Sequence, residues 1–230
     1  MISLYDKITK QKMTLISSLP KNDCKLAKAA WENGADAIKV HINVSHRASG
    51  TMFHSFDEEK ETLLQIVDES PVPVGIVLGA DTHSVLKDYP KILDHPFDFI
   101  SLYIHHTPPR LLMDHKHTTT MLACDYSYHI SEMEYIKDLH PQLLEASIVS
   151  PELYGEPLNS RDLLQYRRLV KTTELPVIVP SQKKIQVGDI TSLAAVGVKG
   201  IMLGAVVTGD TEETIKESMT LFREKISKLK

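Results

Sequence analysis

Short apolar runs alternate along the chain with stretches in which apolar residues recur at helical spacing. The runs with strand character cover residues 13–17, 37–43, 73–79, 97–104, 118–125, 143–150, 176–180 and 200–207. Alternation of such runs with amphipathic segments predicts a parallel sheet. Eight strand–helix units in 230 residues predict one α/β domain, a single (β/α)8 or TIM barrel. An open doubly wound sheet fits less well, because no glycine-rich phosphate turn follows the first run.

The helices expected between these strands have recognisable ends. They are expected after Asn22, from Asp57, and over residues 84–93, 132–139, 161–173, 189–196 and 211–228. Asn22 has a side chain that caps helix N-termini, and Asp210 with Glu213 matches a capping pattern before the last helix. The connection over residues 44–56 lacks helical periodicity and is expected to be a long loop.

Composition and charge exclude several classes of protein. Hydrophobic residues make up 42% of the chain and charged residues 24%, as in ordinary globular proteins. The net charge of −4 disfavours nonspecific binding to nucleic acid or to a membrane surface. No apolar run approaches the ~20 residues of a membrane span, and the first residues lack the pattern of a secretion signal. Cys24 and Cys124 form no CxxC pattern and favour free thiols in a reducing compartment, so the cytoplasm is the expected location.

Polar residues at the carboxyl ends of the strands are the candidate site residues, because ligands of (β/α)8 barrels bind there. Within residues 37–43, apolar side chains alternate with Lys39, His41 and Asn43, which are expected to face the lumen. Lys39 is a candidate acid/base group or Schiff-base amine, and equally a structural ion-pair residue. His41 is a candidate proton carrier, and Asn43 a candidate substrate-binding residue.

A second group of candidates lies on the sixth run and at the end of the fifth. Glu145 and Ser147 share one face of the sixth run, and Asp125 ends the run before it. A lumen carboxylate beside Lys39 makes an acid/base pair able to move a proton next to a carbonyl, with Ser147 and Asp125 as substrate-binding groups. A buried structural pair of Lys39 and Glu145 explains the same residues.

The last quarter of the chain has the pattern of an anion site. Gly204 and Ala205 follow the last strand, where a glycine lets the backbone approach an anion and a short helix points free N–H groups at it. After the seventh strand, Ser181, Gln182 and Lys183 offer a hydroxyl, an amide and a positive charge. The alternative is that Gly204 only packs a helix against the barrel.

This quarter of the chain resembles the ribulose-phosphate-binding barrels. The resemblance rests on PVIV at residues 176–179, AAVGV at 194–198 and GIMLGA at 200–205. It is nearest to barrels similar to N-acylmannosamine-6-phosphate 2-epimerases, and it implies a phosphate held by the loops after strands seven and eight. Where those epimerases have a catalytic lysine and a catalytic glutamate, this chain has Leu78 with Gly79 and Pro180 with Ser181. Their reaction is therefore not implied.

The long connection over residues 44–56 is expected to act as a lid or binding loop, as long loops in compact domains often do. Arg47 can bind a carboxylate or phosphate through two parallel hydrogen bonds, His46 adds a donor or acceptor, and Gly50 can supply a hinge. An ordinary exposed loop is the alternative.

Eleven histidines raise the question of a metal. His105, His106, His115 and His117 are close in sequence, but they form no HxH or HExxH arrangement on one regular element. No metal ligands and no cofactor are predicted, and a divalent metal is a minor alternative.

The residues together favour an isomerase or lyase that uses acid/base chemistry on a phosphorylated sugar or a small phosphorylated acid. The alternative is a noncatalytic barrel that binds a phosphorylated metabolite as a sensor or subunit, since the epimerase catalytic residues are missing. In both cases the expected partner is a small phosphorylated metabolite rather than nucleic acid or a membrane. Self-association into a homo-oligomer is compatible with either reading.

Overall fold

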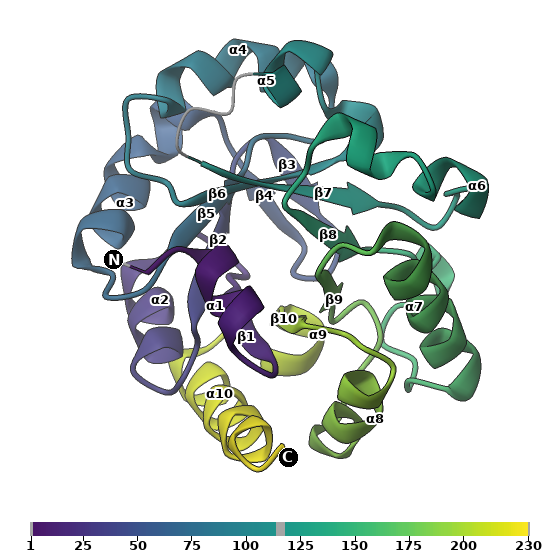
Figure 1. Cartoon of the computed structure of the whole chain (residues 1–230). Helices are drawn as coiled ribbons and strands as arrows, with labels where there is room; N and C mark the ends of the chain where they lie inside the picture. Colours follow the sequence, from purple (N-terminus) through teal and green to yellow (C-terminus); the bar gives the residue numbers. More distant parts are fainter. Residues whose placement is uncertain (1, 114–117, 230) are drawn as a thin grey trace.

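Eight parallel strands form the centre of the molecule and close on themselves as a barrel (Figure 1). The computed structural model describes residues 2–113 and 118–229. Around the barrel the strands follow the order β1-β10-β9-β8-β7-β6-β5-β2, and β2 pairs with β1 to complete the ring. They are β1 (Thr14–Ser18), β2 (Ala37–His41), β5 (Val74–Val77), β6 (Phe99–Tyr103), β7 (Thr119–Cys124), β8 (Leu143–Ala146), β9 (Val177–Pro180) and β10 (Gly200–Leu203). The predicted (β/α)8 barrel is confirmed.

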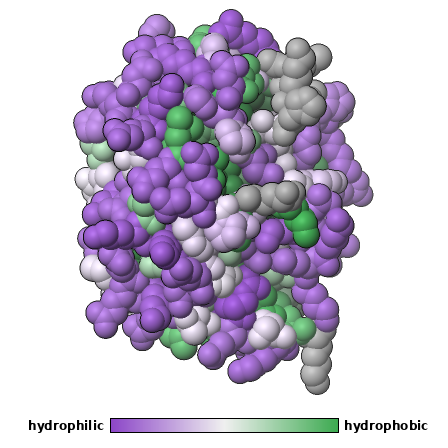
Figure 2. Space-filling model, turned by 90° about the vertical axis from the view of Figure 1, so that its left-hand side faces the viewer, coloured by the Kyte–Doolittle hydropathy of each residue, from purple (hydrophilic) through white to green (hydrophobic). Residues whose placement is uncertain are grey.

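Helices surround the ring of strands (Figure 1). The α-helices are α1 (Leu4–Lys10), α2 (Cys24–Trp31), α3 (Phe56–Glu69), α4 (Thr82–Ile92), α5 (Pro109–Met113), α6 (Ile130–Met133), α7 (Ser160–Thr173), α8 (Ile190–Ala195), α9 (Ala205–Thr208) and α10 (Glu212–Ser227). Short 3-10 turns are η1 (Ile104–His106), η2 (Ile136–Leu139), η3 (Pro151–Leu153) and η4 (Val187–Asp189). The face in Figure 2 is largely hydrophilic, with apolar atoms in a few small areas. Across the described residues, no helix combines the length and the apolar character needed to cross a bilayer.

The connection after β2 is a β-hairpin and not the predicted loop. β3 (Val44–His46) pairs antiparallel with β4 (Thr51–Phe53). Gly50 lies in the turn between them at φ +68, and its N–H donates to the His46 carbonyl at 2.8 Å. Each strand of the hairpin is too short to produce an alternating pattern that can be read from sequence, so the prediction was wrong here.

The barrel has an apolar floor that is separate from the larger core between strands and helices. Inward side chains of the strands form this floor: Ile16, Ala37, Phe99, Met121, Leu143, Ile178 and Met202. α1 closes the amino-terminal end of the barrel, because Leu4 and Ile8 pack into the same cluster and are fully buried. Among the described residues, the way into the barrel for a ligand is therefore from the opposite, carboxyl end of the strands.

Two helix caps differ from those predicted. Asp23, not Asn22, caps α2, and its carboxylate accepts from the N–H groups of Lys25 and Leu26. Thr211, not Asp210 with Glu213, caps α10. In each case the cap lies one residue later in the chain, and only there can the side-chain oxygen reach the N2 or N3 amide. The freed Asn22 instead donates to the His41 carbonyl at 2.7 Å, which ties the end of β2 to the loop after β1.

Candidate functional site

A cavity of about 340 Å³ opens at the carboxyl ends of the strands. This volume lies in the range of small-molecule sites. Of the predicted site residues, nine line it: Lys39, His41, Arg47, Asp125, Glu145, Ser147, Ser181, Gln182 and Gly204. Asn43, Lys183 and Ala205 are not among its lining residues.

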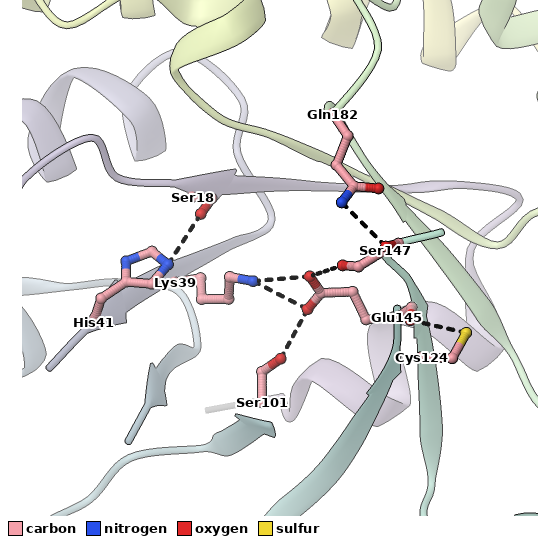
Figure 3. Close-up of polar contacts among 8 residues, drawn as sticks. All are labelled: Ser18, Lys39, His41, Ser101, Cys124, Glu145, Ser147 and Gln182. Carbon is pink, nitrogen blue, oxygen red and sulfur yellow. Dashed lines mark hydrogen bonds and ion pairs between the residues drawn. The ribbon is translucent and has the colours of Figure 1, made fainter. Parts of the chain in front are cut away.

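An ion pair between Lys39 and Glu145 spans the lumen at the bottom of this cavity (Figure 3). Lys39 Nζ lies 3.2 Å from Glu145 Oε1 and 3.0 Å from Oε2, and each side chain is only 7% exposed. β2 and β8 are four positions apart in a ring of eight strands, so their inward side chains approach each other from opposite walls. The structure thus brings together two residues that are 106 positions apart in sequence.

Two serines complete the hydrogen bonding of the Glu145 carboxylate. Ser101 Oγ donates to Oε2 at 2.8 Å and Ser147 Oγ donates to Oε1 at 3.0 Å (Figure 3). Burial by itself raises the pKa of Glu145, but the charge of Lys39 and the hydrogen bonds from Ser101, Lys39 and Ser147 outweigh it, so the pKa lies below its ordinary value. Glu145 is therefore an anion at neutral pH, and each of its oxygens accepts two hydrogen bonds.

His41 lies beside this pair, two residues further along β2 and nearer the mouth. Its Nε2 is 3.5 Å from Ser18 Oγ, while its Nδ1 is buried and has no hydrogen-bond partner among the described residues. Burial, the neighbouring His46 and the positive charge of Lys39 hold the pKa of His41 well below its usual range. The ring is consequently neutral at pH 7, and it lines the cavity.

The β3–β4 hairpin covers His41. The ring of His41 contacts those of His46 and Phe53 at centroid distances of 5.1 and 4.8 Å. Burial, followed by the charge of Lys39, lowers the pKa of His46 to about 4, and its Nδ1 lies 2.8 Å from Ser49 Oγ. The hairpin therefore packs against His41, and its exposed Arg47 side chain lines the cavity.

Asn43 anchors the base of the hairpin instead of facing the lumen. Its Nδ2 donates to the Leu78 carbonyl at 3.0 Å and to Asp88 Oδ2 at 2.8 Å. The reason is local: Asn43 has φ +53, a left-handed conformation that ends the strand and breaks the alternation on which the prediction relied. A direct contact between Asn43 and a ligand in the cavity is not supported.

The predicted anion end of the cavity is formed by the segments after β9 and β10. The Gly204 N–H donates to Ser181 Oγ at 2.8 Å, which joins the two segments. Gly204 precedes α9, and the N–H groups of Ala205 and Val206 have no hydrogen-bond partner within the described residues. These donors are oriented as the first N–H groups of a helix are, so they remain the candidate ligands of an anion even though the Ala205 side chain does not line the cavity.

Gln182 and Lys183 have different places from those expected. The Gln182 amide donates to the Ser147 carbonyl at 3.1 Å and to the Tyr154 hydroxyl at 2.6 Å, and it accepts from the Val149 N–H at 3.1 Å. All its groups are thus engaged in joining the loops after β8 and β9. Lys183 is 3% exposed and is not among the lining residues of the cavity, so it offers no charge there.

Asp125 follows β7 and lines the cavity. Its carboxylate accepts from the backbone and the hydroxyl of Ser127, at 2.9 and 2.7 Å, and lies 3.9 Å from His105 Nδ1. Among the described residues, no three histidine, cysteine or acidic side chains are grouped as a metal would need. His115 and His117 lie outside the described residues.

Ser101 and Tyr103 are site residues that the sequence analysis missed. Both point inward from β6 and line the cavity. Burial and the charge of Glu145 raise the pKa of Tyr103, so it is a neutral phenol. Their signal was present, because Phe99, Ser101 and Tyr103 alternate with apolar residues in the same way as Lys39 and His41 do.

Several solved structures with the same fold are enzymes that differ from this chain in most residues. Thiamine phosphate pyrophosphorylase from Pyrococcus furiosus is 17% identical, and the alignment covers 95% of this chain and 98% of the enzyme at a TM-score of 0.65. N-(5'-phosphoribosyl)anthranilate isomerase from Pyrococcus furiosus is 15% identical, and the alignment covers 94% of this chain and 100% of the enzyme at a TM-score of 0.64. Tryptophan synthase from M. tuberculosis is 12% identical, and the alignment covers 99% of this chain and 98% of the matched chain at a TM-score of 0.71.

Sequence comparison adds nothing to this likeness. No protein-family model matches the chain, and no curated protein sequence matches it. At the identities above, the solved structures establish the fold and not the reaction. The chain thus has the (β/α)8-barrel fold that these enzymes share.

Proposed function

We propose that this chain is an isomerase or lyase that acts by acid/base chemistry on a small phosphorylated metabolite, either a phosphorylated sugar or a phosphorylated acid. The observation that carries the proposal is the buried Lys39–Glu145 pair, which lies at the bottom of an open cavity whose rim includes Ser181 and Gly204. A pair with a purely structural role gains nothing from facing a cavity large enough for a ligand.

The proposed phosphate site consists of backbone groups and one hydroxyl. The N–H groups of Ala205 and Val206 lack partners, and Ser181 Oγ lies beside them as an acceptor of the Gly204 N–H that can donate its own proton. Two backbone donors at the start of a helical turn favour an oxyanion. This site fixes one end of the metabolite and leaves its other atoms over the lumen.

Lys39 is the proposed electrophile. The Lys39 ammonium donates to both oxygens of Glu145. A substrate carbonyl oxygen can replace one of these carboxylate oxygens as the acceptor. Negative charge that develops on this carbonyl oxygen in an enediolate is stabilised by the ammonium and by the neutral His41 ring. The Glu145 oxygen that loses its bond to Lys39 is then free to accept the proton from the adjacent carbon.

A noncatalytic binding barrel is the second candidate, and a specific observation favours it. Glu145 has a lowered pKa and accepts four hydrogen bonds, which makes it a weak base until a ligand disturbs the network. The same contacts describe a well-satisfied structural ion pair.

Exchange of carbon-bound hydrogen with D2O separates the two candidates. Sugar phosphates and phosphorylated hydroxy acids are incubated with the protein, and deuterium at the carbon next to the carbonyl is followed by NMR. We expect exchange or turnover for at least one compound, and its loss in His41→Ala but not in the exposed control His83→Ala. Saturable binding without exchange for every compound contradicts the enzyme and supports the binding barrel.

The proposed setting of this activity is the cytoplasm. Both cysteines, Cys24 and Cys124, are free thiols, as is usual in a reducing compartment. The proposed partner is the small metabolite itself, without nucleic acid or a membrane.

A further inference from the structure

The layer of helices is thin outside β7. The segments that cover this part of the barrel are α6 and η2, with four residues each, whereas α3, α7 and α10 have 14, 14 and 16 residues. α6 lies at the periphery of the molecule, outside β7 (Figure 1). A hollow of about 530 Å³ is lined by residues of η1, the end of β7, α6 and η2. This volume is typical of small-molecule sites.

The sequence after β7 explains why no longer helix fills this space. Its apolar residues recur every three positions: Ile130, Met133, Ile136 and Leu139. A repeat of three matches the three residues per turn of a 3-10 helix, whereas it drifts around an α-helix, which has 3.6. His140 then adopts φ +55 and Pro141 follows it, so η2 ends there. The short turns leave the outer side of β7 incompletely covered.

The floor of the hollow is apolar. We call Cys124, Met133 and Ile136 the floor, and these side chains are 2%, 4% and 2% exposed. The Cys124 thiol donates to the Glu145 carbonyl at 3.8 Å, so this weak donor is already engaged. Tyr135 and Leu139 line the hollow toward solvent and are 67% and 39% exposed. Apolar surface of the floor and of these two side chains is therefore available to a ligand.

Three carboxylates border this apolar space. We call Asp125, Glu132 and Asp138 the acidic rim. Glu132 and Asp138 are exposed and have no ion-pair partner within the described residues, while Asp125 lies 3.9 Å from His105 Nδ1. In the described part of the chain, no lysine or arginine lines the hollow. The acidic rim therefore attracts a positive group and repels an anion.

We propose that this hollow is a second ligand site, which takes a small organic cation with an apolar body, an aliphatic or aromatic ammonium. The apolar body packs on the floor, and the ammonium lies beside the acidic rim. The ring faces of Tyr128 and Tyr135, which line the same hollow, also favour a cation. The proposal uses neither Lys39 nor the phosphate site, so it is independent of the proposed function.

Titration of the full chain followed by two-dimensional amide NMR tests the proposal, because it reports both affinity and location. The probes are hexylamine and phenethylamine, and the controls are hexanol and hexanoate, which keep an apolar body and change the charge. An exposed ion pair changes affinity by a factor of up to about five. Three carboxylates therefore predict that hexylamine binds about tenfold more tightly than hexanol, with hexanoate weaker still. Added salt should reduce this preference, since it screens exposed charges.

The amide signals that shift identify the site. We expect saturable shifts at Met133, Tyr135 and Ile136 in the hollow, and none at Lys39 or Gly204 in the main cavity. Residues that line both spaces do not distinguish them and are left out of this comparison: His105, Ala123 and Asp125.

Variants of the acidic rim test the role of charge. Glu132→Gln/Asp138→Asn should lower the affinity for hexylamine about fivefold and leave that for hexanol unchanged. The matched control Glu134→Gln/Asp210→Asn removes the same two charges from exposed positions that do not line the hollow. Circular dichroism checks the folding of each variant, and the single variants Glu132→Gln and Asp138→Asn keep the test valid if the double variant does not fold.

Each contrary outcome removes a definite part of the proposal. Equal affinity for hexylamine and hexanol overturns the cation as the ligand, as does a loss in the control variant as large as that in the rim variant. Absence of saturable binding for both amines, or shifts confined to the main cavity, overturns the site itself. None of these results bears on the proposed function, which deuterium exchange tests separately.

Discussion

Removal of the Lys39 charge is expected to destabilise the fold in a way that depends on pH. In Lys39→Met the hydrocarbon part of the side chain is kept, but Glu145 is left buried without its cation. Both side chains are 7% exposed, so solvent screens the lost interaction very little. Breaking a buried pair by removing one partner costs about 3–5 kcal/mol, against less than ~1 kcal/mol for an exposed pair. We therefore expect a loss of about 3–5 kcal/mol at pH 7.

The sign of the pH dependence follows from the two states of Glu145. In the natural chain its folded pKa is below the unfolded value, so its contribution to stability is present above the unfolded pKa, ~4.3, and is lost only as the pH falls through the lower folded value. Without Lys39, burial raises the folded pKa above the unfolded one. The variant is then more stable below the unfolded pKa and loses that stability as the pH rises. The difference between the two proteins should shrink as the pH is lowered from 8 to about 5.

Urea denaturation across this pH range measures both effects. The double variant Lys39→Met/Glu145→Gln should recover most of the loss, because no buried charge remains. Lys10→Met is the matched control, since it breaks an exposed ion pair with Asp6 in which Lys10 is 70% exposed. A loss for Lys39→Met no larger than that for Lys10→Met refutes the reasoning, as does a loss that is the same at pH 5 and pH 8.

Three further predictions concern the floor, the hairpin and a cap. Gly75→Ala should lower the free energy of unfolding by about 1–3 kcal/mol, because the new Cβ would lie 2.3 Å from the Phe99 ring. Thermal denaturation measures the loss, and Gly188→Ala is the control, since its new Cβ meets no atom within 4 Å. His46 has a folded pKa of about 4, below its unfolded value of ~6.5, so the free energy of unfolding should fall as the pH drops from ~6.5 toward 4. In His46→Gln, urea denaturation should show a smaller fall over this pH range. An unchanged pH dependence contradicts the assignment. Thr211→Ala should cost about 1 kcal/mol through loss of the α10 cap, and Asp210→Ala much less, as measured by urea denaturation; equal losses would restore the sequence-based assignment.

The order of strands and the location of the site followed from local sequence pattern. Alternation of apolar runs and helical stretches specified the barrel, and alternation within residues 37–43 placed Lys39 and His41 in the lumen. The same parity rule failed at Asn43, where a positive φ turns the chain. The rule also holds for Ser101 and Tyr103, which lie on β6 in the same pattern and line the cavity.

Contacts between distant segments could not be read from the sequence. The seating of His46 and Phe53 on His41 depends on a hairpin whose strands are too short to show alternation. The engagement of Gln182 by the loop after β8, and the burial of Lys183 away from the cavity, depend on how two loops pack.

Within the regular strands, the sequence by itself determined which residues face inward, because the direction of a side chain on a strand depends on its parity. It thus determined the barrel, its open end and the presence of a lysine and a glutamate in the lumen. Only the tertiary structure decided that these two meet at 3.0 Å, that the β3–β4 hairpin covers His41, and that His41 is neutral. Those properties depend on closure of the ring, which brings strands far apart in sequence to opposite sides of one small water-poor space.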